Sequence, residues 1–211
     1  MKKIFIISAI SLSTIYYGQT MINNVNDFYT TAMNNGTINN STSENISGSP
    51  YLTNDYLVTK ISNLNNSISA RYNIYKDEIE FKNNDKIFLV PKTDSYSKIS
   101  FSNGTNLILV NNNYYVITYQ QGNNMILKKE KIKYNPAMEA RSSYQEPKPA
   151  SYTKASPQFF LLSNNSNVTE ITKEELIKLY PEKDINSFLS KNKINFKNEN
   201  EFIKLGQFIF N

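Results

Sequence analysis

Three acidic side chains close together on one predicted strand are the first candidates for catalysis. Asp77, Glu78 and Glu80 form the densest acidic group in the sequence. Glu78 and Glu80 are two residues apart, so on a strand both project from one face at a spacing of roughly 7 Å. Paired carboxylates can act as general acid and base on a glycosidic bond. The alternative is a solvent-exposed face, because the glutamates alternate with Ile79 and Phe81.

A run of lysines is a second candidate, for binding. Lys129, Lys131 and Lys133 alternate along a predicted strand, so we expect them to share one face. Such a row could contact an anionic glycan, lipopolysaccharide or phosphate. The alternative is a charged edge strand, whose lysines discourage pairing with the sheets of other molecules.

Tyrosines provide a third candidate surface, for stacking on sugar rings. Tyr115 and Tyr119 are the two that we assign to binding, and further members of the group are Tyr72, Tyr75 and Tyr114. Tyrosine is also a good strand former, so the alternative is packing in the core and across strands. Tryptophan, the strongest stacking side chain, is absent.

The sequence has no cysteine and no histidine. Without cysteine there is no disulfide, no thiolate metal site and no cysteine nucleophile. Without histidine the commonest general base and the imidazole metal ligands are missing. The sequence has no phosphate-binding loop and no nucleophile elbow. We therefore expect no metal and no cofactor.

The first eighteen residues have the pattern of a secretory signal peptide. Lys2 and Lys3 precede an apolar run over residues 4–15, and the small residue Gly18 follows. The run is shorter than the roughly 20 residues that span a bilayer, so we expect cleavage after Gly18 and no membrane span in the mature chain. An uncleaved N-terminal anchor is the alternative. Cleavage lowers the formal charge from +5 to +3, and so small a positive charge does not indicate binding to nucleic acid.

The predicted mature chain, which we expect in the periplasm or outside the cell, divides into four regions. Residues 19–47 are rich in Asn, Ser and Thr and are interpreted as a flexible arm, with a short helix indicated over residues 25–33. Residues 48–135 have a period-two pattern that predicts an antiparallel meander, closed into a small barrel or folded into a sandwich. Residues 136–157 contain four prolines and are interpreted as an extended linker.

Residues 158–211 are predicted to form a hairpin followed by two or three short helices. Thr172 and Glu175 form a capping box, in which each side chain satisfies a free backbone donor at a helix start. Asn198 and Glu201 form a second, weaker one. The fold class that we expect is therefore α+β, with an antiparallel meander followed by short C-terminal helices.

Several segments resemble a known family. They are residues 48–52 (GSPYL), residues 71–80 (RYNIYKDEIE) and the tail from residue 173 to residue 205. In these segments the chain is similar to a family of secreted proteins of unknown function that is common in Bacteroidota. The resemblance implies export and brings no catalytic or ligand-binding residues with it.

Our leading hypothesis is an exported, non-enzymatic binding or structural protein of the periplasm or cell envelope. Its partner would be an envelope protein or a glycan. The alternative hypothesis is a carbohydrate-active hydrolase that uses Asp77, Glu78 or Glu80. A toxin or effector exported to neighbouring cells is a third possibility, which the sequence neither supports nor opposes.

Overall fold

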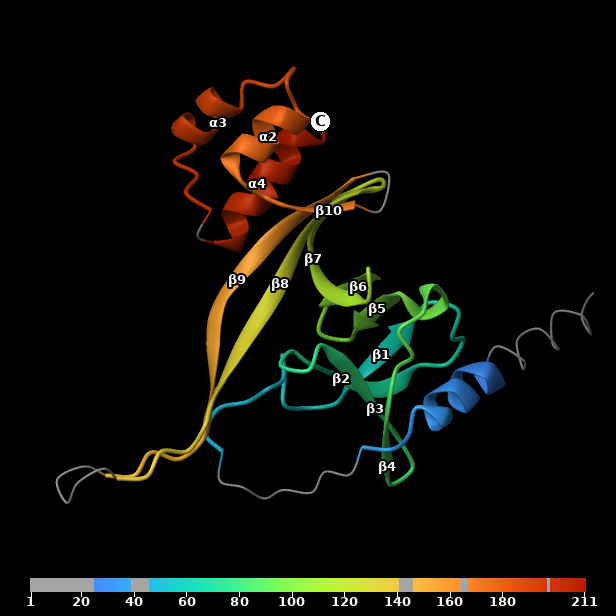
Figure 1. Ribbon diagram of the computed structural model, residues 1–211. Coiled ribbons are helices and arrows are strands. Elements are labelled where there is room, and N and C mark those ends of the chain that lie inside the picture. The colour runs from blue at the N-terminus through green and yellow to red at the C-terminus, as the bar shows by residue number, and fades with distance from the viewer. Residues whose placement is uncertain (1–24, 39–45, 141–145, 164–166, 197) are drawn as a thin grey trace, which may run out of the picture.

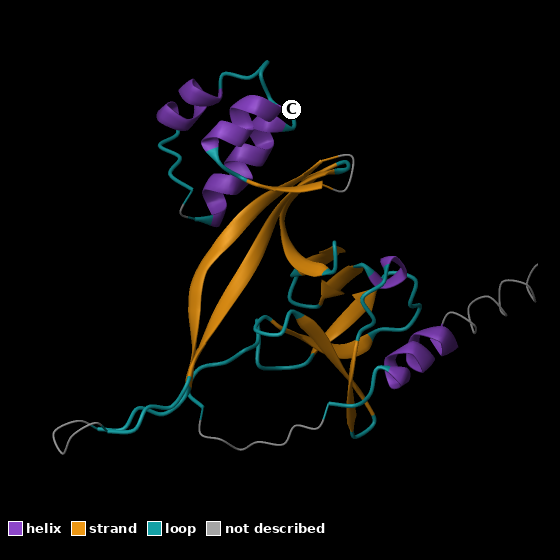
Figure 2. Ribbon diagram, in the orientation of Figure 1, coloured by secondary structure: helices purple, strands orange, loops and turns teal. Residues whose placement is uncertain are grey.

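The structure is a computed structural model that describes residues 25–38, 46–140, 146–163, 167–196 and 198–211. The predicted signal peptide lies outside the described residues, as do residues 19–24 and 39–45 of the predicted arm. Ten strands form one antiparallel sheet in the order β10-β9-β8-β7-β6-β5-β1-β2-β3-β4. Figure 1 shows the sheet running from three C-terminal helices at one end to the N-terminal helix at the other, and Figure 2 separates the element types by colour.

The strand bounds agree closely with the sequence pattern. Within residues 48–135, the period-two pattern predicts strands at 97–101, 106–110, 113–120 and 124–134, and these match β5 to β8 to within one residue. The ten strands are β1 Leu57–Ile61, β2 Ile68–Asn73, β3 Glu78–Asn83, β4 Lys86–Leu89, β5 Lys98–Phe101, β6 Asn106–Val110, β7 Asn113–Gln121, β8 Asn124–Asn135, β9 Ser151–Ser163 and β10 Asn167–Glu170.

Asparagine and glycine residues make the tight links between these strands. Asn84 joins β3 to β4 with φ 55°, and Asn111 and Asn112 join β6 to β7 with φ 49° and 62°. This left-handed region is costly for most side chains and tolerated by Asn and Gly. The links can therefore be short, and each strand pairs with its neighbour in antiparallel register.

The sheet is open, with β10 and β4 at its two edges. Residues 37 and 38 partly cover the β4 edge, because Thr37 pairs with Phe88 and the Ile38 N–H donates to the Ile87 carbonyl at 2.9 Å. The expected α+β class, with an antiparallel meander and C-terminal helices, is confirmed. The sequence pattern left two arrangements open, a closed barrel and a sandwich, and the open sheet does not close into a barrel.

The described part of the predicted arm packs on the sheet. Residues 25–34 form a helix, and Phe28 and Ala32 on it are fully buried. The Phe28 ring lies 5.2 Å from the ring of Phe81 and 4.9 Å from that of Tyr96. The interpretation of this segment as a flexible tether is therefore wrong for residues 25–34. The helical spacing of its apolar residues is what buries one face.

The predicted proline linker also differs in the structure. β9 begins at Ser151, so residues 151–157 belong to the sheet. Lys129 pairs with Gln158 and Lys131 with Ala155, which leaves two residues of β9, one of them Pro157, opposite Glu130. Proline is tolerated at such a bulge because its missing N–H needs no ladder partner.

One stretch of the sheet is only two strands wide. The pairing of β7 with β8 ends at Lys128, and that of β10 with β9 ends at Phe160. Residues 131–135 of β8 and 151–157 of β9, called the ribbon below, therefore pair mainly with each other. Figure 1 shows the two strands running away from the helices toward residues 136–140. Ser47 adds one bridge to the ribbon at Ser151.

Three short helices follow the sheet, and each begins at a side-chain cap. They are α2 Lys173–Leu179, α3 Ile185–Lys191 and α4 Glu199–Ile209. The N-cap residues Thr172 and Asn198 accept from the backbone N–H of the third helical residue, which is the N-cap half of each predicted capping box. The helices bury Leu176, Ile185 and Leu205 in one core with Ile126 and Phe159 of the sheet.

The largest core lies between the N-terminal helix and the strands from β1 to β7, and includes Phe28, Tyr72, Phe81 and Tyr114. It is distinct from the core under the C-terminal helices, although both take residues from β7 or β8. Within the described residues, no helix is long and apolar enough to cross a membrane.

Candidate functional site

Glu80 lies in a buried polar cluster and not on the exposed face that its alternation with apolar residues suggests. It is 1% exposed. Arg71 Nε and Nη2 donate to its carboxylate at 3.0 and 2.8 Å, and Asn73 Nδ2 donates at 3.0 Å. The rings of Tyr51 and Tyr56 lie 3.6 and 4.4 Å from the Arg71 guanidinium carbon and cover this side of the strand.

This cluster is built for stability. A general acid or base must reach the substrate directly or through one water, and the donors of the protein already surround the Glu80 carboxylate. Burial raises the pKa of Tyr51 and raises that of Tyr56 to about 12, so both phenols stay protonated beside it. Glu78 is partly exposed at the start of β3, where it pairs with Asn73 of β2.

Asp77 is the centre of a second polar cluster. It lies in the turn between β2 and β3 with φ 57°. Its carboxylate accepts from the Tyr72 hydroxyl at 2.6 Å and from the Tyr114 backbone N–H at 3.2 Å. The ammonium of Lys129 lies 2.7 Å from it and that of Lys92 lies 3.4 Å from it. Asp77 therefore joins the β2–β3 turn to β7 and β8, which are not its neighbours in the sheet.

The Lys129 ammonium contacts two oxygen groups, the Asp77 carboxylate and the Tyr114 backbone carbonyl. Its ammonium also donates to the Tyr114 carbonyl at 2.9 Å, and burial lowers its pKa against the opposing effect of Asp77. Sequence reasoning placed Asp77 and Lys129 in separate candidate sites, and the structure brings them together. No sequence signal could have paired them, since they are 52 positions apart and their strands are not neighbours.

Two of the candidate tyrosines are core residues. Tyr72 and Tyr114 are 2% and 0% exposed, and their rings pack edge to face with centroids 6.0 Å apart. Burial raises the pKa of both phenols. The Tyr114 hydroxyl has no hydrogen-bond partner among the described residues. Neither ring is available for stacking on a sugar.

The other tyrosines pack on neighbouring side chains. Tyr115 lies against Phe160, with ring centroids 5.4 Å apart, and its ring faces the Lys129 ammonium at 5.1 Å. Tyr119 stacks on Phe210, with centroids 6.0 Å apart. A Cβ at Gly206 would overlap the Tyr119 ring, so the glycine lets α4 approach β7 closely.

Lys131 and Lys133 differ from Lys129. Both are exposed on the ribbon, and neither makes an ion pair with another described residue. Lys154 of β9 is exposed opposite Ile132. The ribbon contains no acidic residue. The expected row of lysines thus consists of one lysine held by Asp77 and two that are free in solvent.

Three tyrosine rings, one exposed and two partly buried, help to hold the ribbon against the rest of the sheet. Tyr75, in the β2–β3 turn, lies 6.2 Å from Tyr134 and 5.4 Å from Tyr152, measured between ring centroids. Gly48, with φ 79°, runs so close to Tyr152 that a Cβ there would overlap the Tyr152 carbonyl oxygen. Of the tyrosines that the sequence singles out, Tyr75 is the exposed one, at 47%.

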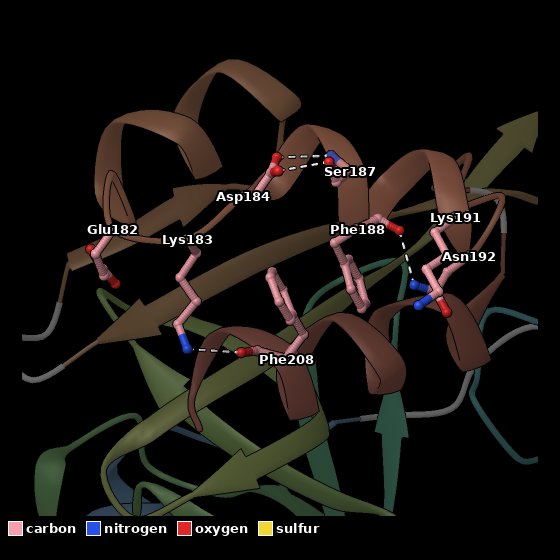
Figure 3. Close-up of a pocket in the computed structure, with 8 residues that line it drawn as sticks. All are labelled: Glu182, Lys183, Asp184, Ser187, Phe188, Lys191, Asn192 and Phe208. Carbon is pink, nitrogen blue, oxygen red and sulfur yellow. Dashed lines mark hydrogen bonds between the residues drawn. The ribbon is translucent and has the colours of Figure 1, made fainter.

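A surface cleft between α3 and α4 was not foreseen from the sequence. Its volume is about 590 Å³. Figure 3 shows the rings of Phe188 and Phe208 facing each other at its centre, and their centroids are 4.0 Å apart. Lys183 Nζ donates to the Phe208 carbonyl at 3.1 Å. Asp184 caps α3, and the hydrogen bonds from Ser187 lower its pKa.

The cleft is lined by two positive and two negative side chains, and Lys183 and Asp184 among them already make hydrogen bonds within the protein. Lys183 and Lys191 line it together with Glu182 and Asp184. The signal available in the sequence was the helical spacing of Phe188 and its neighbours, which indicates an apolar face and says nothing of a cleft.

In the part of the chain that the structure describes, no group of acidic side chains is arranged to hold a metal ion. The structure therefore offers two polar clusters that stabilise the fold, a ribbon with free lysines, and surface clefts. No family model, no curated protein and no solved structure matches this chain, so its similarity to the secreted Bacteroidota family stays a prediction.

Proposed function

We propose that this chain is an exported, non-enzymatic protein that binds an anionic glycan of the periplasm or cell surface through the ribbon. The observation that carries the proposal is the pair of free lysines on one face of the ribbon, Lys131 and Lys133, in a segment without acidic residues. Lys154, opposite Ile132, adds a third exposed positive charge on the other face of the ribbon. A group of one sign that no internal partner neutralises attracts a polymer of the opposite sign.

The geometry of the ribbon suits a linear polymer. Lys131 and Lys133 are two residues apart on β8, so their side chains leave the same face at a spacing of about 7 Å. Their cross-strand partners are Ala155 and Thr153, both small, which leaves the ammonium groups accessible. An extended chain with regularly spaced carboxylates or sulfates can meet both lysines at once.

The anchoring of the ribbon also supports binding. The Asn135 amide donates to the Thr153 hydroxyl at 3.2 Å, and the tyrosine contacts fix the ribbon against the β2–β3 turn. A surface that is already ordered loses less conformational entropy when a ligand binds.

The non-enzymatic part of the proposal is supported by the acidic residues. Glu80 is paired with Arg71 and Asp77 with Lys129, so both carboxylates are engaged by contacts within the fold. Incubation with anionic and neutral glycans should therefore release no reducing ends. Turnover that disappears in the Glu78→Gln variant would contradict this part of the proposal.

Binding is tested with a sulfated polysaccharide, heparin, and with neutral dextran of similar length. The triple variant K131Q/K133Q/K154Q should bind heparin roughly 3- to 160-fold more weakly, since each of the three exposed charge pairs contributes about 0.2–1 kcal/mol. The matched control is K60Q/K86Q/K173Q, which removes the same charge from exposed lysines elsewhere.

Binding of the natural protein should weaken as salt rises, because salt screens exposed charges. Equal losses in the two triple variants would show that total charge matters and the ribbon does not. Binding to dextran as strong as that to heparin would also refute the proposal.

A further inference from the structure

We propose that the second half of β7 is a docking edge for an extended peptide, which would add one strand to the sheet there. Residues 113–116 of β7 pair with β6 on one side, and the pairing ends at Val116. Residues 117–121 pair with β8 on the other side. No strand in the described part of the chain pairs with their second edge.

A groove lies along this open edge. Its volume is about 490 Å³, and residues 117–120 of β7 form one wall of it. Ile99, Leu107 and Met125 also line it, and each of them is almost fully buried. A second cavity of about 340 Å³ shares Asn106 and Ile117 with the groove, so the two meet where β7 leaves β6.

The open edge is fixed in place. The register of β7 on β8 shifts between Ile117 and Tyr119, and a bulge of this kind turns the strand away from its former partner. The Thr118 hydroxyl donates to the Glu199 carboxylate at 3.3 Å, and Lys128 binds the same carboxylate at 2.9 Å. Helix α4 therefore holds the bulge. Strand β6 begins at Asn106 and does not extend along this part of β7.

The composition of the edge distinguishes it from the protected edges of the same sheet. Proteins usually protect an open edge with charged residues or proline. Residues 117–121 read Ile-Thr-Tyr-Gln-Gln and contain neither. The β4 edge, in contrast, begins with Lys86 and pairs with residues 37 and 38. An open strand edge beside a groove lined by both polar and apolar residues is the feature that strand addition uses.

The groove also indicates the chemistry of the peptide. Lys98 is the one charged residue among the described residues that line it, so an acidic side chain is favoured nearby. The alternate side chains of an added strand would point toward the apolar residues of the groove. The preferred occupant is an extended segment of another protein with alternating apolar residues and one acidic residue. This inference does not depend on glycan binding by the ribbon.

The test uses the full-length natural protein and an array of decapeptides in which apolar and polar residues alternate. One half of the array has a glutamate at a fixed polar position, and the other half has a lysine there. We expect binding to the glutamate peptides and at least tenfold weaker binding to the lysine peptides. Absence of binding to every peptide at millimolar concentration would overturn the proposal.

Backbone pairing is tested with the best peptide, methylated on alternate amide nitrogens. Methylation of the edge that faces β7 should abolish binding, while methylation of the opposite edge should leave it unchanged. Equal effects of the two methylation patterns would refute strand addition. Amide hydrogen exchange at residues 117–121 should slow when the peptide binds.

The variant Ser100→Trp places a large side chain in the groove from an exposed position. It should weaken peptide binding at least tenfold, and the control Ser69→Trp, on exposed β2 surface, should not. Heparin binding by the ribbon should be the same in both variants, so failure of one proposal is distinguishable from failure of the other. A natural dimer that Ser100→Trp converts to monomer would overturn the proposal in favour of a second copy as the occupant.

Discussion

Replacing Arg71 by methionine should destabilise the protein strongly. The variant keeps an apolar stem between Tyr51 and Tyr56 and removes the cation that lies 2.8 Å from the Glu80 carboxylate. Glu80 would then be a charge at 1% exposure with no cationic partner. Breaking a buried ion pair from one side costs about 3–5 kcal/mol, which is a large part of the 5–15 kcal/mol typical of a domain.

The effect is measured by urea unfolding at neutral pH. With a urea dependence of about 2 kcal/mol/M, the midpoint should fall by about 2 M. The double variant R71M/E80L should recover most of the loss, because a well-packed apolar pair often replaces a buried ion pair without cost.

The control is Lys82→Met, which removes an exposed cation 4.4 Å from the Tyr56 ring and should change stability by less than about 1 kcal/mol. A free energy of unfolding for R71M within 1 kcal/mol of that of the natural protein would refute the prediction. It also fails if R71M/E80L loses as much as the two single variants together, since the residues would then act independently.

Two further predictions concern the N-terminal helix and alkaline pH. Phe28→Ala should cost about 3–5 kcal/mol in urea unfolding, because the ring is fully buried, and Met33→Ala, at a 52% exposed position, should cost less than 1 kcal/mol; equal effects would show that the helix does not pack. The raised pKa values of Tyr72, Tyr114 and Tyr56 mean that the unfolded chain loses these protons first, near pH 10. The contribution of these tyrosines to the free energy of unfolding should therefore be fully present below about pH 10 and fall toward pH 12. A urea midpoint that rises over that interval would contradict the burial of these phenols.

Local signals in the sequence predicted the strands and the helix starts well. Period-two alternation placed β5 to β8 correctly, and the side chains of Thr172 and Asn198 accept at the helix starts as expected. These features depend on residues a few positions apart, whose backbone preferences act before tertiary packing.

The candidate sites depended on contacts between distant residues. Alternation indicated that Glu80 faces solvent, and the chain from Tyr51 to Tyr56 covers that face and makes the prediction wrong. The linker was misjudged because proline was taken as incompatible with a strand, whereas a bulge accommodates Pro157. The arm was misjudged because its average polarity outweighed one buried stripe around Phe28.

The two cores share strand β7, so they should unfold together. Tyr114 and Val116 of β7 belong to the N-terminal core, and Tyr119, five positions after Tyr114, packs in the core under the C-terminal helices. If either core unfolds, β7 loses its packing there, and the other core loses the support of the same strand. Calorimetry should therefore record one cooperative transition, and a protease that removes the tail helices would expose the remainder to complete digestion.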